Sequence, residues 1–133
     1  MSLDRIDPPE LARPSGFTHA VVATGITVFL AGQTALDASG EIVGDGIVGQ
    51  FEQALSNLLT ALRAAGGTPA DLASLTIYIV DMDGYRAHAR EVGAVWRRLM
   101  GTAYPATAGV GVARLWDVEA LVEVQGTAVL PPA

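Results

Sequence analysis

Few side chains in this sequence have the type and spacing that catalysis or metal binding requires. The chain has no cysteine, which excludes disulfides, thiolate catalysis and cysteine-ligated metals. Its two histidines, His19 and His88, stand alone, whereas zinc requires a cluster of three or four ligands. No serine lies in a Gly-x-Ser-x-Gly context, which counts against a serine nucleophile. The glycine-rich run GDGIVG lacks the lysine of a phosphate-binding loop, and GVGVA lies within a predicted strand.

The remaining polar candidates each have a structural interpretation. His88 falls on the apolar stripe of a helix predicted over 84–99, where we expect a buried, hydrogen-bonded histidine. His19 begins a predicted strand close to Phe17. Glu123 stands between two valines, an alternation that is typical of an outward-facing residue on a strand.

Composition and charge limit the classes of protein that fit. A chain of 133 residues is suited to one domain over 1–133, and no apolar run reaches the roughly 20 residues that cross a bilayer. The start, MSLDRIDPPE, is no secretory signal, so we expect a cytoplasmic protein. The net charge is −6 and all eight basic residues are arginine, which counts against a nucleic-acid partner. The only adjacent pair, Arg97 and Arg98, is expected on a solvated helix face.

Two helices are predicted from apolar residues that recur at three- and four-residue steps. The first covers 47–65, with Asp45 as its cap and Gly66-Gly67 as its end. The second covers 84–99, with Asp83 as its cap. Its stripe is Tyr85, His88, Val92, Val95 and Leu99; that of the first is Val48, Phe51, Leu55, Leu58 and Leu62.

The β-branched segments predict a sheet with one uncovered face. Residues 19–31 are expected to form two strands broken by Thr24-Gly25, and a turn is expected over 37–40. Further strands are expected at 75–80, 108–113 and 121–129. Right-handed crossovers place both helices on one face of this sheet. Since ITVFLA and LTIYIV are apolar at nearly every position, we expect self-association to cover the other face.

The order of several short motifs resembles one known family. Phe17-Thr-His-Ala-Val-Val and Val28-Phe-Leu-Ala-Gly-Gln33 are similar to the opening of Rid proteins, also called the YjgF or endoribonuclease L-PSP family. Tyr104-Pro-Ala106, Val110-Gly-Val-Ala-Arg-Leu115 and Val122-Glu-Val124 resemble later family segments. The resemblance implies an α+β fold, with a mixed β-sheet backed by two helices as in chorismate mutase, and a barrel-like homotrimer with pockets between subunits. It also implies hydrolysis of reactive imines and enamines without a metal or organic cofactor.

The resemblance also assigns site residues. Glu123 matches a glutamate that positions the attacking water, and Phe17 replaces a pocket tyrosine. Gly32 and Gly109 match positions where the backbone approaches the substrate, although each could equally mark a strand irregularity. Thr107 stands where active members have a carboxylate-binding arginine, and threonine cannot make that bidentate contact.

Three functions follow as hypotheses. The first is a divergent Rid protein with an intersubunit pocket for a small metabolite, which hydrolyses an imine, an enamine or a related carbon–nitrogen bond with a water held by Glu123. The alternative is a non-catalytic metabolite-binding or regulatory module. An endoribonuclease is disfavoured, since RNA recognition relies on basic grooves and stacking. Arg114, the nearest arginine to Thr107, is expected to serve structure or an interface.

Overall fold

The central sheet has four strands, and buried residues alternate with less buried ones along its two middle strands, 72–79 and 122–130. The structure is a computed structural model that describes residues 3–133. The sheet order is β3-β6-β4-β5, with β4 and β5 parallel and the other neighbours antiparallel. The strands are β3 (Ile26–Gln33), β4 (Leu72–Ile79), β5 (Ala106–Gly111) and β6 (Val122–Leu130). The strand predicted at 75–80 is therefore confirmed, and it lies in the interior of the sheet.

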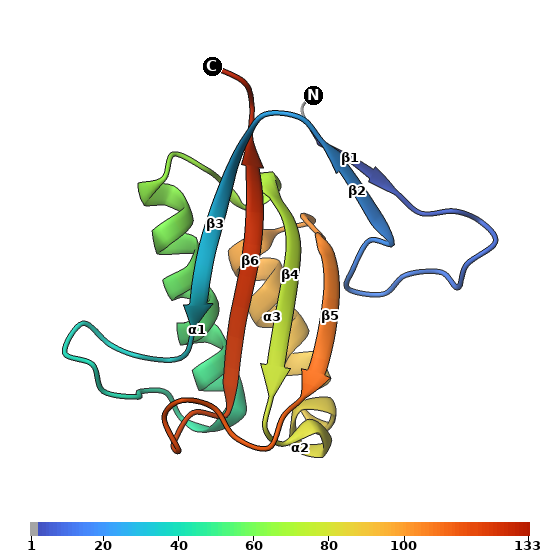
Figure 1. Cartoon of the computed structure of the whole chain (residues 1–133). Coiled ribbons are helices and arrows are strands. Elements are labelled where there is room, and N and C mark those ends of the chain that lie inside the picture. The colour runs from blue at the N-terminus through green and yellow to red at the C-terminus, as the bar shows by residue number, and fades with distance from the viewer. Residues whose placement is uncertain (1–2) are drawn as a thin grey trace.

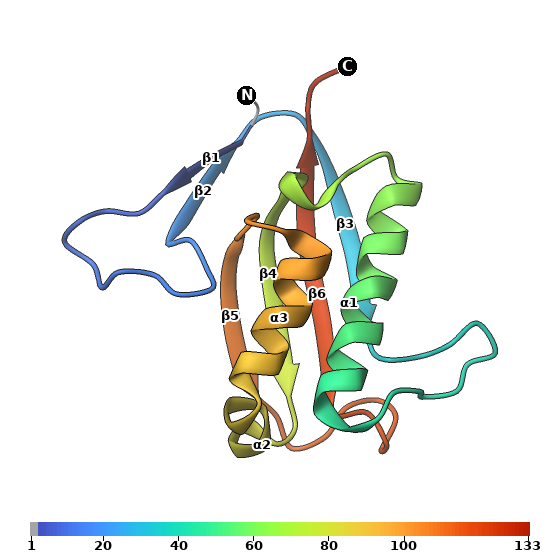
Figure 2. The same cartoon turned by 180° about the vertical axis from the view of Figure 1, so that it is seen from behind.

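The helices cover one face of this sheet, as Figures 1 and 2 show from opposite sides. They are α1 (Gly46–Ala64), α2 (Met82–Ala87), α3 (Ala89–Met100) and a short 3-10 turn (Pro69–Asp71). The predicted α+β class, with a mixed sheet and helices on one face, is confirmed. Within residues 3–133, no helix combines the length and apolar character that crossing a membrane demands.

The N-terminal strands form a separate ribbon. β1 (Leu3–Ile6) pairs antiparallel with β2 (Ala20–Ala23), and both stand off from the sheet on the side of β5 (Figure 1). The break at Thr24-Gly25 is confirmed, because the Gly25 φ of 148° lies in a region that other residues rarely adopt. The two strands on either side of that break do not pair with each other within the described sheets.

Helix α1 follows the sequence prediction closely. Asp45 is at the N-cap position, although its side chain makes no capping hydrogen bond. At the other end, the amides of Gly66 and Gly67 donate to the carbonyls of Arg63 and Leu62, each at 2.9 Å. This pair of bonds is a Schellman motif, which the Gly66 φ of 93° permits. The predicted end of the helix is therefore confirmed.

The single helix predicted over 84–99 is two helices in the structure, α2 and α3. The chain breaks at His88, whose φ and ψ of −106° and 22° are not helical. The predicted cap Asp83 is wrong: Asp81 is the N-cap of α2, and its carboxylate accepts from the Gly84 amide at 3.0 Å. Because Asp81 satisfies that amide, the helix starts one residue after it, at Met82, and Asp83 lies inside the first turn.

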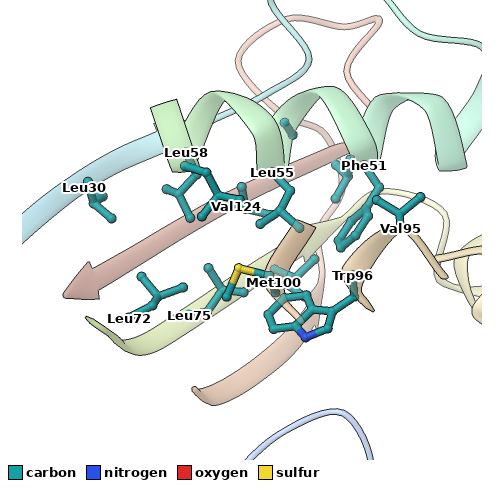
Figure 3. Close-up of a cluster of buried hydrophobic side chains, with 14 of the residues drawn as sticks. Leu30, Phe51, Leu55, Leu58, Leu72, Leu75, Val95, Trp96, Met100 and Val124 are labelled. Atoms are coloured by element: carbon teal, nitrogen blue, oxygen red, sulfur yellow. The ribbon is translucent and has the colours of Figure 1, made fainter. Parts of the chain in front are cut away.

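The core lies between the sheet and the two longer helices. Phe51, Leu55, Leu58 and Leu62 of α1 are fully buried, which confirms the predicted stripe. Figure 3 shows several of these side chains facing Val124, Leu75 and Leu72 of the sheet, with Trp96 and Met100 of α3 beside them. Of the second stripe, His88 is exposed rather than buried, because the break between α2 and α3 places it outside the packed face.

The opposite face of the sheet is uncovered in the single chain and mixed in character. Phe29 is 83% exposed, and Val110 is also exposed. Between them run the polar side chains of β4 and β6, including Tyr78 and Gln125. The prediction of strands that are apolar on both sides is therefore right for β3 and wrong for the outer face of β4.

The predicted turn over 37–40 is present. One carboxylate oxygen of Asp37 accepts from the backbone amides of Ser39 and Glu41 at 2.9 and 3.0 Å. The bond from Glu41 is the main reason that the pKa of Asp37 lies below its usual value, since it stabilises the ionised form.

Candidate functional site

Glu123 and Gly32 lie against each other on the uncovered face. A β-bulge between Leu30 and Gln33 takes Gly32 out of the regular ladder between β3 and β6. A Cβ built on Gly32 would overlap the carboxylate of Glu123 and lie 2.9 Å from its Cδ. Gly32 therefore marks a strand irregularity, which was one of its two interpretations, and its missing side chain makes room for the half-buried carboxylate.

Two polar residues accompany Glu123, and the sequence reasoning did not select them. Tyr78 of β4 is the direct cross-strand partner of Glu123, so both side chains project from the same face. The Tyr78 hydroxyl donates to Oε1 of Gln125 at 3.3 Å. The alternation of side chains along β4 and β6 could have pointed to Tyr78 and Gln125, but only if the register between the two strands had been known. This group offers a carboxylate acceptor and a phenol in one place.

A pocket of about 400 Å³ lies at the β5 edge of the sheet. Phe17 and Thr107 both line it, so the structure brings these two predicted residues together. The chain before β2 reaches this edge because Thr18 forms an isolated bridge with Ala106. The bridge includes a hydrogen bond from the Thr18 amide to the Pro105 carbonyl at 3.2 Å.

The hydroxyl of Thr107 forms a hydrogen bond within its own segment. Its hydroxyl donates to the carbonyl of Pro105 at 2.8 Å, so the single hydroxyl proton is already used. Arg114 does not substitute for an arginine here. Its guanidinium donates to the carbonyls of Leu115 and Trp116 at 3.1 and 3.2 Å, which confirms the predicted structural role. Within the described residues, the edge pocket has no arginine in its lining.

The histidines differ in position. His19 lines the edge pocket, where its ring packs edge-on against Phe17 with centroids 5.1 Å apart. Its Nε2 lies 2.7 Å from the carbonyl of Ala12. His88 bonds through Nδ1 to the carbonyl of Gly84 at 2.8 Å, at the junction of α2 and α3. Among residues 3–133, no three or more histidine, aspartate or glutamate side chains converge as a metal site would need.

Gly109 lies apart from both groups. It pairs with Ile77 in the regular parallel ladder, and a Cβ there would make an ordinary 3.8 Å contact with Cδ1 of Ile79. Gly109 therefore needs no special geometry on the helix side. It lines neither the edge pocket nor the group around Glu123.

The candidate residues thus form two separate groups in the single chain. Thr107 is in register with Leu75, which faces the helices, whereas Glu123 is in register with Tyr78 on the other face. β4 lies between their strands, and the registers differ by three residues. Strand spacings of ~4.8 Å and rises of ~3.3 Å per residue put their Cα atoms roughly 14 Å apart. One small molecule cannot contact both residues within one chain.

Thr107 also lines a second pocket of about 400 Å³ on the helix side of the sheet. The sequence reasoning did not predict it. Nothing in the sequence distinguishes its aromatic residues from ordinary core residues, and only tertiary packing reveals the space between them. These residues are Phe51, Tyr85, Trp96 and Tyr104.

Comparison with known proteins places this geometry in context. The sequence profile described as endoribonuclease L-PSP matches residues 10–130. A RutC family protein of Pyrococcus horikoshii is 32% identical over 87% of this chain and 89% of its own length. The 2-iminobutanoate/2-iminopropanoate deaminase of Capra hircus is 32% identical over 80% of this chain and 74% of its own.

A solved structure has the same fold throughout. The conserved Rid-family protein of unknown function from Yersinia pestis superposes with a TM-score of 0.87 at 36% sequence identity, and the match covers 98% of this chain and 100% of that one.

Proposed function

Because this chain belongs to the endoribonuclease L-PSP family, also known as the Rid or YjgF family, we propose that it hydrolyses a small imine or enamine in a pocket between its own subunits. The observation that carries the proposal is the placement of the Glu123 carboxylate in the space left by Gly32. Relatives named 2-iminobutanoate/2-iminopropanoate deaminase support the reaction class.

The pocket is completed by a second copy of the chain, and the assembly is a homotrimer. The half-site at Glu123 and the half-site at Phe17 and Thr107 are too far apart to share a substrate within one chain. The exposed Phe29 and Val110 supply the apolar surface that an obligate interface buries. A neighbour that covers this face brings its own half-site toward Glu123.

The reaction needs one water and one carboxylate. Glu123 accepts a proton from water as the oxygen attacks the carbon of the C=N bond, which forms a carbinolamine. Glu123 gives this first proton to the nitrogen, which completes the amino group of the carbinolamine. It then takes the proton of the new hydroxyl and passes it to the nitrogen as the C–N bond breaks, so that ammonia leaves and a C=O bond remains. The sum is R₂C=NH + H₂O → R₂C=O + NH₃, with no oxidant or cofactor required.

Thr107 shapes the substrate class. Its hydroxyl is bonded to Pro105 and offers no charge, so a substrate carboxylate gains no ion pair at this position. We therefore propose a substrate that does not rely on a carboxylate contact there. A protein with an arginine at this position would gain about 1.5–3 kcal/mol of binding free energy from a charged hydrogen bond to a substrate carboxylate, and Thr107 does not supply it.

The test is ammonia release from freshly generated 2-iminopropanoate and 2-iminobutanoate, together with a neutral imine such as that of acetone. Wild type is compared with Glu123→Gln and Thr107→Arg, and Glu91→Gln on the exposed first turn of α3 is the matched control. We expect turnover of the neutral imine that Glu123→Gln removes and Glu91→Gln retains. Thr107→Arg is expected to shift preference toward the two imino acids.

Absence of turnover in wild type and in Thr107→Arg, with all three substrates, would overturn the catalytic proposal in favour of a binding module. The assembly is tested separately by light scattering after size exclusion. We expect three times the 13.8 kDa mass of one chain for wild type and a smaller species for Phe29→Glu. A wild-type monomer would refute the intersubunit pocket.

A further inference from the structure

Strand β3 has one free edge. It is an outer strand in the sheet order β3-β6-β4-β5, so only β6 pairs with it within the described residues. Its eight residues, ITVFLAGQ, include no charged side chain and no proline, and Phe29 is 83% exposed. Natural proteins protect such an edge with charges, proline or a covering segment, because its unpaired N–H and C=O groups otherwise bind other strands. We therefore expect another strand to cover this edge.

Strand β2 has a free edge as well. Within residues 3–133, the sheet that contains it has only two strands, β1 and β2, so one edge of β2 carries no ladder. A two-stranded ribbon by itself is at best marginally stable in water. Ile6 pairs with Ala20, and Val22 lies two residues from Ala20, so Ile6 and Val22 project from the same face. Both are exposed, and the ribbon therefore lacks both a partner strand and a cover for this apolar face.

The residues between these two strands do not form a hairpin turn. Only Thr24 and Gly25 separate β2 from β3, and two-residue hairpins use type I′ or II′ turns. Both types need a positive φ at the first of the two residues, whereas among residues 3–133 only glycines have one. Threonine is β-branched, which disfavours that conformation. Gly25 passes so close to β6 that a Cβ there would overlap the Leu130 carbonyl oxygen. β2 therefore does not turn back onto the β3 of its own chain.

The N-terminal arm, residues 3–23, is instead held at the opposite edge of the sheet. The Thr18 amide donates to the Pro105 carbonyl, just before β5, at 3.2 Å. The Arg5 guanidinium donates to the Tyr104 carbonyl, also at 3.2 Å. Figures 1 and 2 show the arm on the β5 side. Since β6 and β4 lie between β3 and β5, these outer strands are roughly 14 Å apart. Each side of the chain thus carries one unpaired strand edge.

We propose that the N-terminal arm is exchanged between copies of this chain, so that β2 of one copy pairs with the free edge of β3 in the next. The two edges lie on opposite sides of the chain, so the contact is head-to-tail, and such contacts form a ring when the rotation closes. β2 runs toward the Thr24-Gly25 corner and β3 runs away from it, so rotation about an axis along the strands makes the pair antiparallel. The exchange rests on the self-association proposed above and supplies the strand that links one subunit to the next.

The apolar side chains select the register of the exchanged pair. With Val22 of one copy opposite Thr27 of the next, Ala20 lies opposite Phe29. Val22 and Ile6 then share a face with Phe29, and the exposed apolar side chains of the two copies cover one another. A shift by one residue would turn Val22 and Ile6 to the other face of the sheet. The exchange therefore predicts that Val22 and Thr27 of neighbouring copies lie directly opposite each other.

A disulfide tests this pairing, because the chain has no cysteine of its own. A tagged Val22→Cys chain is co-expressed with an untagged Thr27→Cys chain, oxidised mildly and run on a non-reducing gel. We expect a mixed two-chain species that a reductant separates. Thr127→Cys in place of Thr27→Cys is the matched control. Thr127 pairs with Phe29 and shares its face, but it lies one strand further in, roughly 10 Å from the arm and beyond the ~7 Å that a disulfide spans between Cα atoms.

A chain that carries both Val22→Cys and Thr27→Cys shows whether the arm stays with its own chain. Exchange around a ring of three copies links three chains covalently, whereas a hairpin within one chain leaves only single chains. Thr24→Asn supplies the residue type that type I′ turns prefer before glycine. We expect it to shift the double-cysteine protein from linked chains toward single chains.

Three results would overturn the exchange. The first is a double-cysteine protein that forms disulfides within single chains only. The second is a disulfide between two Thr27→Cys chains with none to Val22→Cys, which would show β3 paired with β3. The third is no more linkage to Thr27→Cys than to Thr127→Cys. Light scattering and ammonia release are measured separately, so a wild-type trimer without the Val22–Thr27 linkage would refute the exchange and leave the proposed assembly and reaction standing.

Discussion

Substitution of Gly32 by alanine should create a conflict with one side chain and nothing else. The three heavy atoms nearest to a Cβ at Gly32 all belong to Glu123, and they are its Oε2, Cδ and Cγ. Gly32 does not have a positive φ, so alanine is compatible with its backbone. The free-energy cost of Gly32→Ala should therefore depend on whether Glu123 is present.

The magnitude follows from two opposing terms. Replacement of glycine by alanine at a compatible φ stabilises a protein by about 0.4–1 kcal/mol through the unfolded state. Forcing the Glu123 side chain from its rotamer costs about 0.5–1.5 kcal/mol. Gly32→Ala should thus be nearly neutral in the wild type and stabilising by about 0.4–1 kcal/mol in Glu123→Ala. The coupling between the two sites should be about 1 kcal/mol.

This coupling is measured by urea unfolding of four proteins: the wild type, the two single variants and the double variant. All are compared at one protomer concentration, because the proposed assembly makes stability depend on concentration. Gly126→Ala is the control. Its Cβ would lie 2.8 Å from the Ser74 carbonyl oxygen, which cannot rotate away, so we expect a loss of about 1–3 kcal/mol in either background. A coupling below about 0.3 kcal/mol for Gly32 and Glu123 would refute the contact between them.

Three further predictions concern stability. Burial raises the pKa of Tyr85 from 10.0 in the unfolded chain to about 12 in the folded one. Between pH 10 and 12, the free energy of unfolding of the wild type should therefore fall by roughly 2–3 kcal/mol relative to that of Tyr85→Phe. The difference between their urea midpoints measures this loss. Gln50→Ala should lower the free energy of unfolding by about 1–3 kcal/mol in the same assay. The buried Gln50 side chain joins α1 to the backbone amide of Leu121 (2.9 Å) and the carbonyl of Glu119 (3.1 Å). A Gln50→Ala protein as stable as wild type would contradict that role. Leu58→Ala should cost about 2–5 kcal/mol by thermal or chemical unfolding, since Leu58 is fully buried, and a loss under 1 kcal/mol would show that the core is not packed as described.

Local periodicity and turn chemistry were readable from the sequence. The stripe through Phe51, Leu55 and Leu58 predicted helix α1, and Gly66-Gly67 predicted its end, because both depend on residues within a few positions of each other. Strands β3, β4, β5 and β6 were predicted within a few residues for the same reason. The family followed from the order of short motifs and is supported by the match over 10–130.

Features that depend on contacts between distant segments were beyond that reasoning. The start of α2 is set by Asp81 rather than Asp83, because the Asp81 carboxylate binds the free amide of Gly84, and the helix predicted over 84–99 is divided at His88. The meeting of Gly32 with Glu123, and the separation of Glu123 from Thr107 by β4, follow from strand order and register. Trp96 reads as an ordinary apolar residue along α3, and only packing leaves its N–H unpaired in a pocket. The sequence by itself determined the elements and the family, while the tertiary structure decided which side chains share a site, because register and packing are set by contacts across the whole chain.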